Sequence, residues 1–138
     1  MKQKKILLLL FLSGFLLGCD PVTTYKKIIH NDSKYTLVVK HYTRAGTLSA
    51  YNLQATYEAR PNSELVLSDG SYLGDANSQS CIIFGDSLVS SVSDQENLKV
   101  DFDFNDSKNW ERSKSGGSAK GYRIECHSTV KDEYVKPK

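Results

Sequence analysis

Apolar and polar residues alternate along two segments of the chain, and this alternation restricts the possible folds more than any other feature. In Leu98–Phe104 an apolar residue occupies every second position, with lysine and aspartate between them. Gly121–Thr129 repeats the pattern, with Tyr122, Ile124 and Cys126 on one side. A period of two separates the two faces of a β-strand, whereas a helix would scatter these residues around its axis. Both segments are predicted to be strands with one face on a core.

The sequence before these two segments is rich in β-branched and aromatic residues and is divided by turn sequences such as Asn31-Asp32-Ser33 and Gly85-Asp86. Six further strands are predicted, at Thr24–His30, Tyr35–Tyr42, Thr47–Tyr57, Glu64–Leu67, Cys81–Phe84 and Ser87–Val92. Seven or eight short strands at this spacing predict an all-β fold, either an antiparallel sandwich or a partly open barrel.

The first eighteen residues have the layout of an export signal. Lys2, Lys4 and Lys5 precede a predominantly apolar run, Ile6–Leu17. As a helix rising about 1.5 Å per residue, this run would extend about 18 Å, whereas the hydrocarbon core of a bilayer is about 30 Å thick. We therefore expect a cleaved signal peptide at residues 1–18 rather than a membrane span.

The apolar run ends in Leu16-Leu17-Gly18-Cys19, which resembles the lipobox of bacterial lipoproteins. The resemblance implies cleavage before Cys19 and lipidation of its sulfur with a diacylglyceryl group carrying chains such as palmitate. Such an anchor would hold an exported domain at the cell membrane or outer membrane, in the periplasm or at the cell surface. Leu17 departs from the family pattern, which more often has a smaller residue there. The alternatives are an ordinary secretory signal and an uncleaved single-span anchor.

Removal of residues 1–18 leaves enough chain for one domain but not for two. We expect residues 19–23 to be a tether, residues 24–130 the β domain and residues 131–138 a flexible tail. The signal contains three lysines and no acids, so its removal changes the formal net charge from +2 to −1. Because the basic excess belongs to the signal, no nucleic-acid partner is expected.

Cys81 and Cys126 remain as an even pair once Cys19 is set aside. In an exported protein such a pair is expected to form a disulfide, which would close a loop of roughly 46 residues. Two unpaired buried thiols are the alternative, because a sequence does not determine the distance between two Cα atoms.

The segment Asn105–Lys120 interrupts the strand pattern and contains Trp110, Arg112 and a Gly-Ser run. Trp110 and Arg112 are the candidate binding residues, because an aromatic ring and a guanidinium in a polar loop suit contact with a protein or a glycan. The alternative is that Trp110 folds back over an open end of the sheet. No phosphate site is expected, because glycine-rich loops bind phosphate where they open a helix.

No catalytic or metal-binding motif is evident. His30, His41 and His127 are far apart in the sequence and have none of the spacings of zinc sites, so we expect exposed strand residues rather than a converged site. Asp101 and Asp103 are expected to face solvent and to pair with cations across strands rather than to act as an acid and a base. We therefore expect no metal, no cofactor and no enzymatic activity.

These features favour a lipid-anchored, non-enzymatic envelope domain that binds an unidentified envelope protein or a glycan, or that has a structural role. The chain also resembles the short β-rich lipoproteins of gram-negative bacteria in length and strand pattern. One alternative is an inhibitor of a foreign enzyme such as lysozyme, since lipoproteins of that kind resemble this chain in size and anchoring. A histidine-based enzyme is a further alternative, and a cleft holding converged His30, His41 or His127 would favour it.

Overall fold

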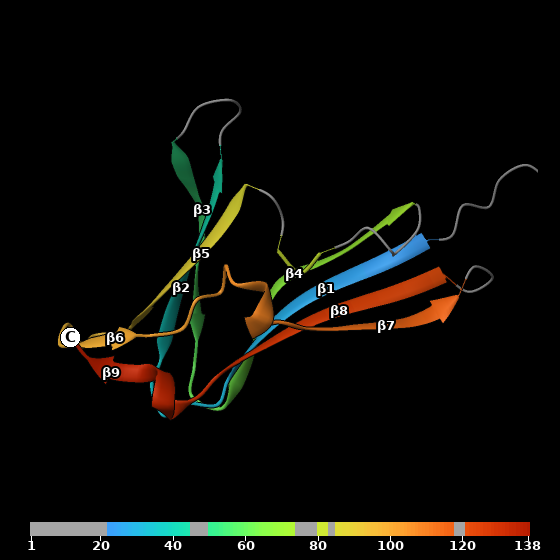
Figure 1. Ribbon diagram of the computed structural model, residues 1–138. Coiled ribbons are helices and arrows are strands. Elements are labelled where there is room, and N and C mark those ends of the chain that lie inside the picture. Colours follow the sequence, from blue (N-terminus) through green and yellow to red (C-terminus); the bar gives the residue numbers. More distant parts are fainter. Residues whose placement is uncertain (1–21, 45–49, 74–79, 83–84, 118–120) are drawn as a thin grey trace, which may run out of the picture.

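The computed structural model describes residues 22–44, 50–73, 80–82, 85–117 and 121–138, and within these ranges the chain is all-β (Figure 1). The strands are β1 (Val22–Asn31), β2 (Leu37–Arg44), β3 (Tyr51–Ala59), β4 (Ser63–Leu73), β5 (Asp86–Val92), β6 (Leu98–Val100), β7 (Glu111–Gly117), β8 (Gly121–Val130) and β9 (Val135–Pro137). Two single-turn 3₁₀ helices, η2 (Ser107–Asn109) and η3 (Asp132–Tyr134), lie between them. The all-β prediction is confirmed.

The strands form three sheets. Sheet A has the order β4-β1-β8-β7, sheet B has the order β3-β2-β5, and β6 pairs with β9. All pairs are antiparallel except β1 and β8, which run parallel. In Figure 1, sheet B rises steeply, sheet A extends to the right, and β6 and β9 lie at the lower left. The described strands do not close into a barrel, and their arrangement is that of an open β-sandwich.

The core lies between the inner faces of sheets A and B. Ile29 and Ile124 of sheet A and Leu37 and Val39 of sheet B are fully buried in one cluster. Burial of each such side chain contributes about 1.5–3 kcal/mol. Buried residues recur at every second position of β8, as the alternation predicts. The hydrophobic pattern therefore determines which face of each sheet is turned inward.

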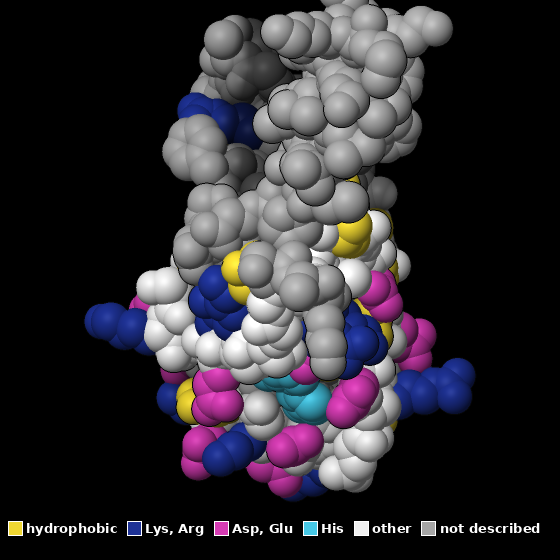
Figure 2. Space-filling view, turned by 90° about the vertical axis from the view of Figure 1, so that its right-hand side faces the viewer, with side chains coloured by type: hydrophobic (Ala, Val, Ile, Leu, Met, Phe, Trp, Pro, Cys, Tyr) yellow, Lys and Arg dark blue, Asp and Glu magenta, His cyan; other side chains and the backbone are white. Residues whose placement is uncertain are grey.

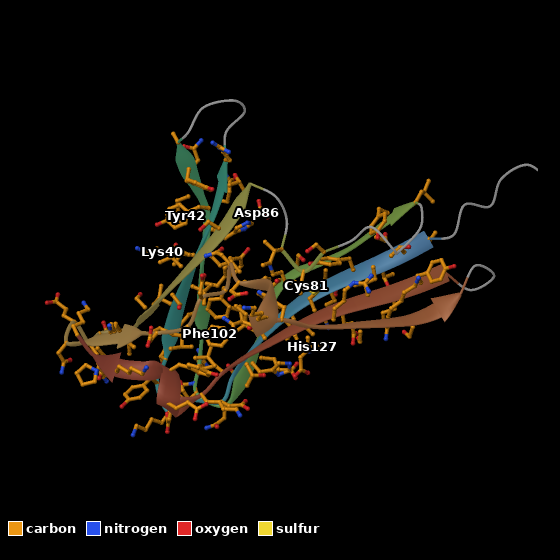
Figure 3. The ribbon with its side chains drawn as sticks, viewed as in Figure 1. Lys40, Tyr42, Cys81, Asp86, Phe102 and His127 are labelled. Carbon is orange, nitrogen blue, oxygen red and sulfur yellow. A yellow bond between two sulfur atoms is a disulfide. The ribbon has the colours of Figure 1, made fainter. Side chains whose placement is uncertain are left out.

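Cys81 and Cys126 form a disulfide, with Cα atoms 5.6 Å apart. Cys126 lies on the inner face of β8 and is fully buried, and Cys81 lies in the connection between β4 and β5. The bond therefore ties this connection to the centre of sheet A, where Figure 3 labels Cys81. The predicted pairing is present, and the alternative of two free thiols is not.

Part of the segment predicted as a loop is a strand. Within Asn105–Lys120, residues Glu111–Gly117 form β7 and pair with β8 along its whole length. Gly116 and Gly121 adopt positive φ angles of 87° and 78°, and a Cβ atom on Gly116 would collide with the carbonyl oxygen of Gly121. The glycines thus serve the turn between β7 and β8, and pairing with a neighbouring strand outweighs the low β-propensity of this sequence.

The C-terminal tail is ordered by pairing rather than frayed. Val135–Pro137 forms β9, which is antiparallel to β6, and the Lys136 ammonium lies 2.6 Å from an Asp101 carboxylate oxygen. Pro137 is compatible with this position because an edge strand does not need every N–H. The predicted flexible tail at residues 131–138 is therefore wrong.

One predicted strand is not formed by its described residues, and another is shorter than expected. Within Cys81–Phe84, Cys81 and Ile82 form a bend, and residues 83 and 84 lie outside the described residues. Leu98–Phe104 is a strand only as far as Val100, although Phe104 is buried while Asp101 and Asp103 are exposed. The alternation there correctly predicts which side chains face the core, but the hydrogen-bonded ladder ends early.

The predicted signal peptide and Cys19 lie outside the described residues, and so does most of the predicted tether. Val22 and Thr23 belong to β1 rather than to a tether. Within the described ranges, no helix has both the length and the apolar character needed to cross a membrane.

The double substitution Cys81→Ala/Cys126→Ala should lower the free energy of unfolding by about 2–4 kcal/mol, because the cross-link restricts the unfolded chain. The two residues are separated by 45 positions, so the loop is long. Urea denaturation of the two proteins measures the difference. A reductant should lower the unfolding free energy of the native protein to nearly that of the variant and leave that of the variant unchanged. Equal unfolding free energies of the two proteins without reductant would contradict this expectation.

Candidate functional site

Trp110 is part of the core, so its predicted role as an exposed binding residue is wrong. Its side chain is 7% exposed, and its indole N–H donates to the carbonyl oxygen of Phe104 at 2.8 Å. The turn that contains η2 returns the chain to sheet A, with the Asp106 side chain accepting from the backbone N–H of Lys108. The alternative prediction, in which Trp110 folds back over the sheet, agrees with this placement.

Arg112 follows two residues later, on β7, and is exposed. It lies opposite Cys126 in the pairing of β7 with β8. The two candidate binding residues thus differ in exposure. Arg112 is accessible to a partner, whereas Trp110 is buried. They do not form one contact surface.

Trp110 instead covers a buried lysine. Lys27 on β1 is 7% exposed, and its ammonium lies 4.4 Å from the centre of the Trp110 ring. Burial lowers the pKa of Lys27 to about 8, and the negative charge of Asp86 opposes this shift. The ring face also favours the charged form through a cation–π contact. Because Lys27 has so little exposed surface, its role is packing rather than chemistry on a substrate.

Asp86, the first residue of β5 in sheet B, acts electrostatically on Lys27 of sheet A. Its carboxylate lies 3.2 Å from Nε2 of His41 on β2. Tyr25, on the same face of β1 as Lys27, has a raised pKa, mainly because of burial and further because of Asp86. Polar and charged groups therefore lie between the two sheets beside the apolar core.

Two histidines that are predicted to be isolated strand residues are in contact. His30 Nε2 lies 2.8 Å from His127 Nδ1. The parallel pairing of β1 with β8 aligns Ile28 with His127 and His30 with Thr129, which makes the two histidines diagonal neighbours on the outer face of sheet A. His41 lies elsewhere, on β2. The expectation of three isolated histidines is therefore wrong for His30 and His127.

A glutamate accompanies each ring of the pair. His30 Nδ1 lies 3.4 Å from Glu64 on β4, and His127 Nε2 lies 3.5 Å from Glu125 on β8. Figure 2 shows histidine side chains at the surface with acidic side chains on both sides of them. No group of three or more His, Cys, Asp or Glu residues within the described ranges is placed to hold a metal ion.

The sequence indicates the outward orientation of the two histidine rings but not the contact between them. Both histidines lie at positions of predicted strands whose neighbours point to the core, so both rings were expected to face outward. The contact itself requires the parallel pairing of two strands whose histidines are 97 positions apart. Nothing in a single sequence indicates that pairing.

The outer edge of β5 is open. Asn105 satisfies the backbone of Leu88 there: its side-chain oxygen accepts from the Leu88 N–H and its amide donates to the Leu88 carbonyl, both at 2.9 Å. Backbone direction alternates along a strand, so the N–H and C=O of Ser90 point the same way, away from β2. Within the described part of the chain, no residue bonds to these groups of Ser90.

A groove follows this open edge. It consists of two cavities of about 440 Å³ and 480 Å³ that share Ser90 and Val100 as lining residues. One wall is β5, and the other is the segment of residues 98–105, which contains Phe102. Figure 3 labels Phe102 and His127, which mark the groove and the histidine pair in different parts of the fold. The groove is the candidate binding site.

No protein-family model matches this chain, and no curated protein or solved structure is similar enough to count as a match. The groove and the histidine pair are therefore defined by the geometry of this chain alone.

The substitution Lys27→Met should raise the free energy of unfolding at pH 7 by about 1–3 kcal/mol, because it removes a charge that burial disfavours. The pKa of Lys27 is about 8 in the folded chain, against an ordinary value of 10.5. Between these values the unfolded chain binds more protons, so the native protein gains stability as the pH rises. The advantage of the variant should therefore shrink between pH 8 and pH 10.

Denaturation with urea at several pH values measures this trend, and Lys40→Met provides the matched control. Lys40 is an exposed lysine of β2, and its substitution should change stability little at any of these pH values. A Lys27→Met variant less stable than the native protein at pH 7, with a constant difference up to pH 10, would contradict the assignment.

Proposed function

We propose that this chain is an exported, lipid-anchored protein of the bacterial cell envelope, and that it binds an extended segment of another envelope protein without catalysing a reaction. The observation that carries the proposal is the groove along the open edge of β5. Among the described residues, the backbone groups of Ser90 that point away from β2 have no partner, and the groove provides space beside them.

Strand addition is the binding mode that suits such an edge. An extended peptide pairs its backbone with the exposed N–H and C=O groups of the strand and places alternate side chains in the groove. Asn105 already makes this kind of contact with Leu88, using a side-chain amide in place of a backbone amide. The same chemistry at Ser90 calls for another amide, which a polypeptide supplies.

A protein partner is favoured over a glycan by the placement of Trp110. Glycan sites commonly use an exposed aromatic face, and the single tryptophan of this chain is buried. The lining of the groove is a strand edge with serine, valine and acidic side chains, together with Phe102, Lys99 and Lys138. This composition suits the backbone of a peptide.

The proposed anchor agrees with the position of the groove. Cys19 precedes the start of β1 by three residues, so a lipid on its sulfur would hold that end of sheet A close to the membrane. Figure 1 shows the start of β1 at one end of the fold and β6, beside the groove, at the other. The groove would then face away from the membrane surface.

Ser90→Pro should abolish partner binding, because proline lacks the N–H that an added strand would use. An edge strand tolerates proline where the N–H is not part of the ladder, and the Ser90 N–H points away from β2. Ser90→Ala keeps the N–H and is the matched control. Crosslinking in intact cells, followed by identification of the captured protein, should recover the same partner with the native chain and with Ser90→Ala, and at least about tenfold less with Ser90→Pro.

Circular dichroism and thermal unfolding of the purified variants establish that each one folds. Recovery of the same partner with a folded Ser90→Pro variant would overturn binding at this edge. Recovery of no partner with any of the three chains would overturn the binding function itself.

The anchor has a separate test, because it does not depend on the groove. Mass analysis of the N-terminal peptide from isolated membranes should give a peptide that begins at Cys19 and carries a diacylglyceryl group. The Cys19→Ala chain should yield no lipid-modified peptide. An unmodified native peptide beginning at another residue would remove the anchor from the proposal.

A further inference from the structure

We propose that the exposed pair Val22 and Leu73, at one end of sheet A, inserts into the headgroup layer of an anionic bilayer and orients the strands of sheet A away from the membrane surface. This inference rests on the proposed lipid anchor at Cys19 and adds a contact that the folded domain itself makes. It does not depend on the groove beside β5.

The terminal pair, Val22 with Leu73, is apolar and exposed. Val22 begins β1, Leu73 ends β4, and the two residues lie opposite each other in the antiparallel pairing of these strands. Their exposed fractions are 47% and 72%, and neither belongs to the core cluster. Only an apolar layer outside the domain can remove this surface from water, which is favourable.

The short link to Cys19 determines what lies next to the terminal pair. Val22 follows Cys19 by three positions, and an extended chain spans at most about 3.6 Å per residue, so the two Cα atoms are at most about 11 Å apart. The headgroup layer on each side of a bilayer is about 5–8 Å deep. With the lipid chains of Cys19 in the hydrocarbon, the terminal pair therefore lies within the headgroup layer or just above it.

The charge on the outer face of sheet A changes with distance from the terminal pair. Arg123 on β8 is exposed and lies opposite Thr24, two positions beyond Val22 along β1. Two positions further, Lys26 lies between Asp69 on β4 and Glu125 on β8. The charge nearest the terminal pair is thus positive, and acidic residues begin at the next level.

The part of this face farthest from the terminal pair is acidic. Glu111 on β7 lies opposite His127, and Glu64 on β4 lies opposite His30. Figure 2 shows Lys and Arg side chains above the histidines and acidic side chains around the histidines. Anionic headgroups attract the cations near the terminal pair and repel the acids beyond them. This gradient favours contact through the end of sheet A over contact through its whole outer face.

Tryptophan substitutions at two depths test this orientation. Leu73 and Val66 are both exposed apolar residues of β4. Val66 lies opposite Ile28, which is on the same face of β1 as Val22. Six positions of β1 at about 3.3 Å each separate the two levels, a distance of about 20 Å. Leu73→Trp therefore probes the terminal pair, and Val66→Trp is the matched control.

The lipidated chain is purified from membranes and reconstituted in vesicles of phosphatidylglycerol and phosphatidylcholine, with or without a brominated phospholipid that quenches nearby tryptophan. The native chain gives the baseline, because its single tryptophan, Trp110, is buried. The emission added by Leu73→Trp should shift to shorter wavelength and lose intensity in the brominated vesicles, since tryptophan favours the interface. The emission added by Val66→Trp should be the same in both kinds of vesicle. Val22→Trp is a second probe of the terminal pair, and circular dichroism establishes that each variant folds.

A charge substitution tests the role of the anionic surface. In the Leu73→Trp background, Arg123→Gln should lower the ratio of docked to free domain about fivefold, because one basic side chain near an anionic surface contributes about this factor. Lys131→Gln is the matched control, because Lys131 is exposed and follows the other end of β8. It should leave the quenching unchanged.

Mass analysis of the same samples separates a failure of this inference from a failure of the anchor. A chain without lipid on Cys19 would overturn both. With the lipid present, unquenched emission from the folded Leu73→Trp and Val22→Trp chains would overturn the contact of the terminal pair and leave the anchor in place. Equal quenching of Leu73→Trp and Val66→Trp would overturn the orientation, because the whole outer face would then lie on the bilayer.

Discussion

The corner at which the chain passes between sheets A and B depends on the buried amide of Asn31. This side chain has no exposed surface, and its Nδ2 donates to the backbone carbonyls of Tyr35, Ala59 and Arg60 at 2.8, 2.9 and 3.0 Å. Its oxygen accepts from the backbone N–H and the hydroxyl of Ser33. Tyr35 precedes β2, and Ala59 and Arg60 lie where β3 leads to β4. Asn31 therefore binds the backbone at both places where the chain passes from one sheet to the other. A buried network with every member satisfied in this way fixes one arrangement of the two sheets.

The groove beside β5 and the histidine pair both follow from that arrangement, although they use different parts of the strands. The inner faces are occupied by the core, by the disulfide and by Lys27 under Trp110. The outer face of sheet A is therefore available for side-chain chemistry, and there the parallel pair of β1 and β8 brings His30 and His127 together. The outer edge of β5 is available for backbone hydrogen bonds, because β2 pairs with only one side of this strand.

The parts of this structure that could be predicted from the sequence are those that depend only on the residue pattern within one strand. The bounds and the buried face of β8 follow from the alternation in Gly121–Thr129, because burial requires a period of two wherever one face meets a core. The parts that could not be predicted depend on a neighbour. Glu111–Gly117 is a strand because β8 offers it a partner, and Val135–Pro137 is one because β6 does. The histidine pair depends on the order of strands in sheet A, which a single sequence does not indicate.

The proposed function requires the outer edge of β5 to be open to a partner strand. Residue-resolved hydrogen exchange of the full chain alone tests it most directly, by comparing the backbone amides of Ser90 and Ser91. The Ser91 N–H points toward β2 and should be protected, whereas the Ser90 N–H lines the groove and should exchange at least about a hundredfold faster. Equal protection of the two amides in the isolated chain would mean that the edge is already occupied, and would contradict the account.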